Sequence, residues 1–167
     1  MTINVTVPCP QGCTLTQGYW KTHNASFKGG APLDDNWNNV TPSKELSGFF
    51  TTSNSFPVLG PNNPPFSWFT VFWTPPQGNA YYNLAHQYEA AKLNYLNGAG
   101  QVQSVTDAIA AAEDFFSHAG DTPAGWASTG YKTKSDLIGW AGILGSYNEG
   151  KIGPGHCSED NTSSSSQ

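Results

Sequence analysis

Apolar side chains recur at the three- and four-residue spacing of an α-helix in three stretches of the second half of the chain. The first stretch, AYYNLAHQYEAAKLNYLNG, follows Asn79 and reaches Gly98. Asparagine commonly caps the start of a helix, and a glycine in the left-handed conformation commonly follows its end. The pattern therefore predicts a helix between these two residues, with a buried stripe of Tyr81, Leu84, Ala85, Tyr88, Ala91 and Tyr95.

A second helix is predicted shortly after the first. Ser104 followed by Asp107 resembles a capping signal, and the helical spacing continues to about Ala119. The residues expected to face inward are Val105, Ile109, Ala112, Phe115 and Phe116.

The third predicted helix starts after Thr133, which has Asp136 at the third position, and stops at Gly150. Its expected inward residues are Leu137, Trp140, Ala141, Leu144 and Tyr147. Each interior glycine costs about 1 kcal/mol relative to alanine. We therefore expect close packing on another backbone along the glycines that recur every third residue, Gly139, Gly142 and Gly145.

The chain begins with a different pattern. In TINVTVP, Ile3, Val5 and Val7 alternate with polar residues, which predicts a half-buried β-strand that ends at Pro8. No neighbouring segment offers this strand a partner.

The segment from about Phe27 to Gly78 is rich in proline, glycine, asparagine and aromatic residues. We expect it to be irregular, with short helical turns near DDNWNNV and PSKELSGFF and a short strand over Trp68 to Trp73. Its aromatic side chains are expected to hold it against the helices.

These elements define a mainly α fold: a three-helix core, a long aromatic and proline-rich irregular segment, and a lone N-terminal β-strand. A chain of 167 residues suits one domain. We divide it into a strand arm over residues 1–10, a globular domain over 11–157 and a polar, serine-rich tail over 158–167.

Composition excludes several kinds of partner. Only 11% of the residues are charged, all the cations are lysines, the net charge is -5 and the pI is about 5.1. A chain without arginine and with this charge suits neither nucleic acid nor an anionic membrane surface, and no segment is long and apolar enough to span a bilayer. The uncharged polar residues that replace charges are typical of proteins outside the cell.

One pair of residues in the first predicted helix could carry chemistry. His86 and Glu89 are three residues apart and share a face, so they could form a general base with its orienting carboxylate. They could also bind zinc, with His23 or His156 as a further ligand. The alternative is a buried histidine that bonds a neighbouring carboxylate and a backbone carbonyl. No HExxH, CxxC, GxSxG or phosphate-loop motif is present.

Other residue groups suggest weaker possibilities. Asp34 and Asp35 could offer oxygen ligands to calcium, although their spacing matches no EF-hand loop. The six tryptophans could form a sugar-binding face, although tryptophan is more often a core residue. The pattern that permits N-glycosylation occurs at Asn4, Asn24, Asn39 and Asn161.

Three longer segments, CTLTQGYWKTH, TPPQGNAYYNLAHQYEAAKLN and GPGHCSED, together resemble a family of exported bacterial proteins with no assigned activity. The resemblance covers nearly the whole chain. It implies an extracellular location and one cysteine in each of the opening and closing motifs, here Cys13 and Cys157, which we expect to form a disulfide. The opening motif then serves as a structural corner. Cys9 departs from the family pattern, and we expect it to bond another subunit.

The expected function is therefore that of a secreted structural or surface protein. An unpartnered strand and a third cysteine favour assembly of copies of the chain into an extracellular filament or matrix, with Ile3, Val5 and Val7 entering a groove of the next subunit. The alternatives are an extracellular enzyme or metal-binding protein that uses His86 and Glu89, and a carbohydrate-binding module based on tryptophan. No catalytic residue is assigned and no cofactor is required.

Overall fold

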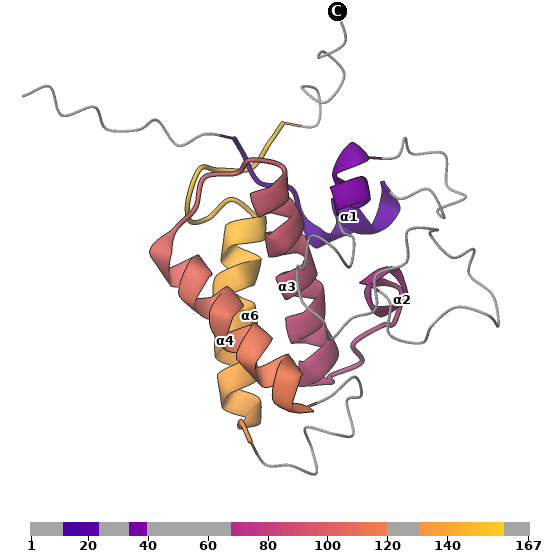
Figure 1. Cartoon of the computed structure of the whole chain (residues 1–167), viewed down its shortest axis with the longest axis vertical. Helices are drawn as coiled ribbons and strands as arrows, with labels where there is room; N and C mark the ends of the chain where they lie inside the picture. The colour runs from indigo at the N-terminus through magenta and orange to yellow at the C-terminus, as the bar shows by residue number, and fades with distance from the viewer. Residues whose placement is uncertain (1–11, 24–33, 40–67, 120–130, 159–167) are drawn as a thin grey trace, which may run out of the picture.

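The fold of the chain is given by a computed structural model, which describes residues 12–23, 34–39, 68–119 and 131–158 (Figure 1). The elements of these residues are all helical: α1 (Gln17–Thr22), the 3₁₀-helix η1 (Asp35–Asn39), α2 (Trp68–Phe72), α3 (Ala80–Leu96), α4 (Gln103–Ala119) and α6 (Lys134–Asn148). The predicted N-terminal strand and the turn near PSKELSGFF lie outside the described residues. None of the described helices has the length and hydropathy needed to cross a membrane.

The core is the expected bundle of three helices. In Figure 1 the chain rises through α3, descends through α4 and rises again through α6. The shorter helices α1, η1 and α2 pack on α3. Because α3 is covered by the other two long helices and by these short ones, it is buried on two faces, and this central position explains why apolar residues occupy two of its faces.

The predicted ends of α3 are confirmed. The side chain of Asn79 accepts a hydrogen bond from the backbone N–H of Tyr81 at 2.9 Å, as an N-cap does. After the last turn, Gly98 takes a left-handed conformation with φ of +83°. The predicted stripe is buried except for Tyr95, which is half-buried.

The start of α4 differs from the prediction. The carbonyl of Val102 accepts hydrogen bonds from the N–H groups of Val105 at 3.0 Å and Thr106 at 2.9 Å. Ser104 therefore lies inside the first turn instead of capping it. The Asp107 carboxylate accepts a hydrogen bond from the Gln103 side-chain amide at 2.8 Å. The five residues expected to face inward are all buried.

Helix α6 begins with the predicted capping box. The Thr133 hydroxyl accepts from the Asp136 N–H at 3.2 Å, and the Asp136 carboxylate accepts from the Thr133 N–H at 2.9 Å. At the other end, Gly150 has φ of +72°, and a Cβ there would lie 2.2 Å from the backbone nitrogen of His156. Only glycine fits this turn, which sends the chain back toward the N-terminal segment.

The expected strand over Trp68 to Trp73 is wrong, because residues 68–72 form α2. Trp68, Val71 and Phe72 are spaced as one face of a helix and are all buried. The ring of Trp68 lies 5.8 Å from that of Tyr88, and the ring of Phe72 lies 5.8 Å from that of His86. Packing of this face on α3 outweighs the preference of aromatic and β-branched residues for strands.

The expectation for the α6 glycines is also wrong. Within the described part of the chain, no atom lies within 4 Å of the position that a Cβ would take at Gly139 or Gly142, and both residues are exposed. Gly145 faces the side chain of Gln87 at 3.5 Å and not a backbone. Among the described helices, therefore, these glycines mediate no close approach of one backbone to another.

Aromatic rings fill the space between α3 and α4. The ring centroids of Tyr81 and Phe116 are 5.1 Å apart, and those of Tyr88 and Phe116 are 5.5 Å apart, both in edge-to-face geometry. Such pairs contribute about 0.5–1.5 kcal/mol each beyond the area that they bury. At the rim, Glu113 accepts hydrogen bonds from Tyr88 at 2.9 Å and from Lys92 at 2.8 Å.

Candidate functional site

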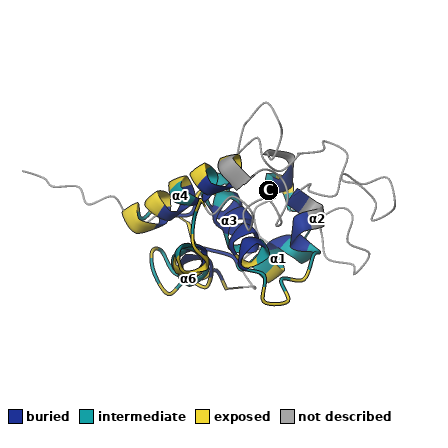
Figure 2. Ribbon diagram, turned by 90° about the horizontal axis from the view of Figure 1, so that it is seen from below, coloured by how far each residue is buried: buried dark blue, intermediate teal, exposed yellow. Residues whose placement is uncertain are grey.

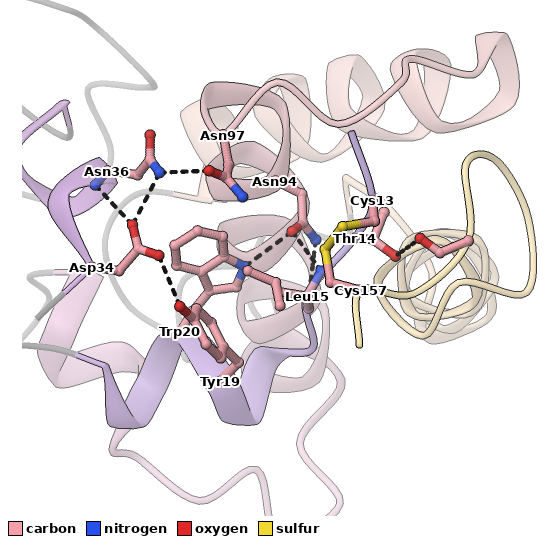
Figure 3. The surroundings of a disulfide bond; sticks show 11 residues. Cys13, Thr14, Leu15, Tyr19, Trp20, Asp34, Asn36, Asn94, Asn97 and Cys157 are labelled. Carbon is pink, nitrogen blue, oxygen red and sulfur yellow. Dashed lines mark hydrogen bonds between the residues drawn. A yellow bond between two sulfur atoms is a disulfide. The ribbon is translucent and has the colours of Figure 1, made fainter. Parts of the chain in front are cut away.

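The described ends of the chain are joined by a disulfide between Cys13 and Cys157. The two Cα atoms are 4.9 Å apart although 144 positions separate the residues in sequence. Figure 3 shows the bond beside α3, and Figure 1 shows the first and last described segments meeting at the end of the bundle where α3 and α6 finish. Both ends of the described chain therefore leave from the same pole of the domain. The predicted pairing is confirmed.

Backbone hydrogen bonds reinforce this junction. The N–H of Thr14 donates to the carbonyl of Gly155 at 2.8 Å, and the N–H of Cys157 donates to the carbonyl of Thr14 at 2.9 Å. These bonds form an isolated parallel bridge between Thr14 and His156. His156 itself is exposed. The last described segment is thus fixed to the first by a covalent bond and a short β-type pairing.

Asn94 on α3 ties the same segment to the core (Figure 3). Its Oδ1 accepts from the backbone N–H of Leu15 at 2.8 Å and from the indole N–H of Trp20 at 3.2 Å. Its Nδ2 donates to the carbonyl of Leu15 at 2.8 Å and to Oδ1 of Asn148 at 3.0 Å. The Asn148 amide then donates to the backbone and side-chain oxygens of Gln87. One buried amide network thereby joins the opening segment, α3 and α6.

The rest of the opening motif forms α1. The Thr16 hydroxyl accepts from the N–H of Tyr19 and caps the helix. The Tyr19 ring stacks on the His23 ring with centroids 3.8 Å apart, and its hydroxyl donates to Asp34 at 3.0 Å. Burial and the neighbouring Asp34 carboxylate raise the pKa of Tyr19. With Trp20 fully buried, the motif is the predicted structural corner.

Of the two aspartates considered for calcium, Asp34 is held by hydrogen bonds within the protein. Asp34 accepts hydrogen bonds from Tyr19 on one oxygen and from the backbone N–H and side-chain amide of Asn36 on the other. Asp35 is exposed in the first turn of η1, which matches the helical turn expected near DDNWNNV. Asp34 therefore serves as the anchor between η1 and α1.

His86 has one of the two contacts that the alternative interpretation predicted, the bond to a backbone carbonyl. Its Nε2 lies 2.6 Å from the carbonyl oxygen of Val71 on α2. Since a carbonyl can only accept, this nitrogen carries the hydrogen and donates it. Burial lowers the pKa of His86, which favours the neutral ring. The Nε2 atom is therefore occupied in joining α3 to α2.

Glu89 has the least usual environment of the charged residues in the described part of the chain. It is fully buried, and neither carboxyl oxygen has a hydrogen-bond partner among the described residues. Burial raises the pKa of Glu89 well above its ordinary value. Burial without a hydrogen-bond partner favours the neutral carboxyl over the carboxylate, which argues against Glu89 as the anion that orients a catalytic His86.

The four residues considered as metal ligands do not form a cluster. His23 stacks on Tyr19, with Nδ1 2.8 Å from the Tyr19 carbonyl, while His156 is exposed beside the disulfide. In the ranges that the structure describes, which include all four residues, no group of three or more His, Cys, Asp or Glu side chains could hold a metal ion.

Three of the tryptophans that the structure describes belong to the core. Trp20, Trp37 and Trp68 are each at most 2% exposed, so these three rings cannot stack on a sugar. Trp37 donates its indole N–H to the carbonyl of Trp20 at 3.1 Å. Three possible glycosylation sites, Asn4, Asn24 and Asn161, lie outside the described residues, and Asn39 is the last residue of η1.

The Asn94–Asn148 network escaped prediction because it joins three segments that are distant in sequence. The available signal was an asparagine at a buried position of a helix that is otherwise apolar on two faces. No protein-family model, curated protein or solved structure matches the chain. The inference of function therefore depends on the geometry of this domain and on its sequence.

Proposed function

We propose that this protein is a secreted structural or surface protein whose copies assemble outside the cell into a filament or matrix. Each chain donates its first strand, residues 2–7, to a groove of the next subunit. The domain described above then serves as the rigid body of the subunit.

The observation that carries the proposal is the Cys13–Cys157 disulfide. The chain contains three cysteines, so this bond leaves Cys9 without any cysteine of its own chain to pair with. Disulfides persist mainly in oxidising compartments, which favours an extracellular location. In such a compartment an unpaired cysteine beside an arm is suited to a bond with another subunit.

The position of the disulfide supports an arm that leaves the domain. Cys13 is fixed to the pole of the bundle, four residues after Cys9 and six after Val7. Pro8 and Pro10 flank Cys9 and restrict the backbone between strand and domain. An apolar strand attached to a rigid pole can pair with a neighbouring subunit, and repetition of one head-to-tail contact gives a filament.

The short strand that we expected over residues 68–73 cannot provide a sheet edge for the arm, since residues 68–72 form α2. The apolar face of the arm is therefore the side of the proposed contact for which residues can be named from the sequence. Ile3, Val5 and Val7 share that face, and Asn4 and Thr6 share the other.

The arm is tested by paired substitutions on its two faces. Val5→Asp places a charge on the apolar face, and Asn4→Asp places the same charge on the polar face. If the strand is donated, Val5→Asp abolishes filaments visible by electron microscopy while Asn4→Asp retains them. Equal assembly of both variants would contradict the proposal.

Cys9 is tested separately. Under non-reducing conditions the wild-type chain should contain an intersubunit bond at Cys9, and Cys9→Ser should remove it without preventing assembly, because strand pairing precedes the bond. A free Cys9 thiol in assembled material would remove the covalent part of the proposal.

A further inference from the structure

The pairing of the first and last described segments leaves one of its edges open. Thr14 points both of its backbone groups at the last segment, because its N–H donates to Gly155 at 2.8 Å and its carbonyl accepts from Cys157 at 2.9 Å. In a parallel pair, the residue opposite, here His156, points its own N–H and carbonyl away from that partner. Within the described part of the chain, neither of these two groups forms a hydrogen bond with another residue. We call residues 155–157 the His156 edge.

The other edge of the same pair is closed. The backbone N–H and carbonyl of Leu15 are bonded at 2.8 Å each by the side-chain amide of Asn94 on α3. These are the two groups that a further strand on that side would need. His156, in contrast, is exposed. A further strand can therefore join this pair at the His156 edge.

Burial on the two sides of this edge specifies which strand fits. His156 is exposed, whereas the next residue, Cys157, is only 7% exposed. Because directly opposite residues of paired strands point to the same side, a strand at this edge needs a polar residue opposite His156 and apolar residues on either side of it. In the arm, Asn4 lies between Ile3 and Val5 and gives this order. A shift of one residue would turn the apolar side chains toward water.

The arm of the same chain leaves on the other side of the pair. Gly12 has φ of +74°, and a Cβ there would lie 2.5 Å from the carbonyl oxygen of Gly98, which follows α3. His156 lies instead beside Gly150, which follows α6 and whose Cβ would lie 2.2 Å from the His156 nitrogen. Figure 1 and Figure 2 place α3 between α6 and α1, the helix that continues the opening segment. The arm therefore starts near the end of α3, whereas the His156 edge lies near the end of α6.

The sequence between arm and domain does not favour a return to this edge. Proline favours extended backbone in the residue before it, and Pro8 and Pro10 follow Val7 and Cys9. We therefore expect this connection to run outward from Gly12. To reach the His156 edge of its own chain, the arm would have to turn back and cross the last described segment. The same edge of a second copy needs no such crossing.

We propose that residues 2–7 of one copy pair with the His156 edge of the next copy, with Asn4 opposite His156 and with Ile3 and Val5 turned toward the receiving domain. This proposal rests on the donation of the arm and adds the edge that receives it. A copy accepts an arm on the α6 side of the pair and donates its own arm from the α3 side. Because the two contacts use different surfaces, their repetition extends the assembly in one direction.

A free arm peptide tests the edge without requiring assembly. The receiver is the full chain carrying Cys9→Ser and Val5→Asp, whose own arm is disabled, and the probe is a fluorescent peptide of residues 1–8. In this receiver, His156→Pro removes the N–H that faces the added strand, whereas His156→Ala removes the same imidazole and keeps the N–H. Fluorescence anisotropy should show the peptide binding at least about tenfold more weakly to the proline variant than to the alanine variant. Equal binding to both variants would overturn the proposal.

Two further measurements cover the case in which the proline variant does not fold. Proline is tolerated in a strand where its nitrogen faces away from the partner strand, so peptide mapping should find the Cys13–Cys157 bond in this variant. If that bond is lost, hydrogen exchange in the wild type decides. The His156 amide should exchange at least about tenfold more slowly in assembled wild-type protein than in the Val5→Asp chain. Unchanged exchange in filaments would overturn this edge alone, and the absence of both filaments and peptide binding would overturn the donated arm as well.

Discussion

The side-chain amide of Asn94 forms hydrogen bonds with both the N–H and the carbonyl of Leu15, each at 2.8 Å. The Asn94 side chain thereby binds the same two backbone groups of Leu15 that a neighbouring β-strand would bind. The remaining bonding positions of Asn94 are taken by Trp20 and Asn148. The amide is buried and all of its four hydrogen-bonding positions are filled.

Replacement of this amide should be costly. Asn94→Leu leaves the Leu15 backbone groups and the Trp20 indole without partners, and each buried unpaired group costs about 1–3 kcal/mol. We expect the free energy of unfolding to fall by about 3 kcal/mol or more in urea denaturation. Asn97→Leu on the exposed end of the same helix is the matched control and should change it far less. If Asn94→Leu lowered the free energy of unfolding no more than Asn97→Leu does, the network would not be important for stability.

The Cys13–Cys157 disulfide should supply much of the stability. In the chain-entropy model, closure of a loop with a sequence separation of 144 residues contributes about 5 kcal/mol. The double variant Cys13→Ser/Cys157→Ser should lose most of this amount in urea denaturation, whereas Cys9→Ser should lose little. Peptide mapping that finds both thiols free in protein isolated without reductant would contradict the structure at this point.

Glu89 should make stability fall as pH rises. Its folded-state pKa is raised above the unfolded value, so the folded state favours the protonated carboxyl. The contribution is fully present below about pH 4.5 and is lost as pH increases through the raised pKa. Between about pH 5 and pH 8, the free energy of unfolding of Glu89→Gln should therefore rise relative to that of the wild type. Exposed Glu149→Gln is the control, and parallel pH curves for wild type and Glu89→Gln would refute this account.

His86 should act structurally. His86→Ala removes the donor to the Val71 carbonyl and should lower the free energy of unfolding by about 1–3 kcal/mol. Elemental analysis of the wild-type protein should find no stoichiometric metal. One equivalent of zinc that disappears in His86→Ala would instead favour a metal site.

Sequence periodicity and capping residues predicted the long helices because their signals are local. Asn79, Thr133 and Gly150 act within a few residues of their own positions, and the structure confirms each role. In α2 the five residues were too few to separate the two periodicities, so packing on α3 decided the conformation. Ser104 has a side chain suited to a cap, but it lies two residues after the capping position of α4, at residue 102.

The polar interior was harder to predict because its contacts join distant segments. Leu15, Asn94 and Asn148 meet only when the bundle has formed, and no local pattern marks them as partners. His86 and Glu89 were predicted to share a face, but the pKa values of their side chains depend on burial, which spacing in the sequence does not specify. The Val71 carbonyl holds His86, while Glu89 has no partner in the described ranges.

Sedimentation velocity of the full chain and of a chain that lacks residues 1–8, over a range of concentrations, tests the donated arm most directly. The account predicts large assemblies for the full chain and a monomer for the shortened chain. Unchanged assembly of the shortened chain, or a full chain that remains monomeric at high concentration, would contradict it.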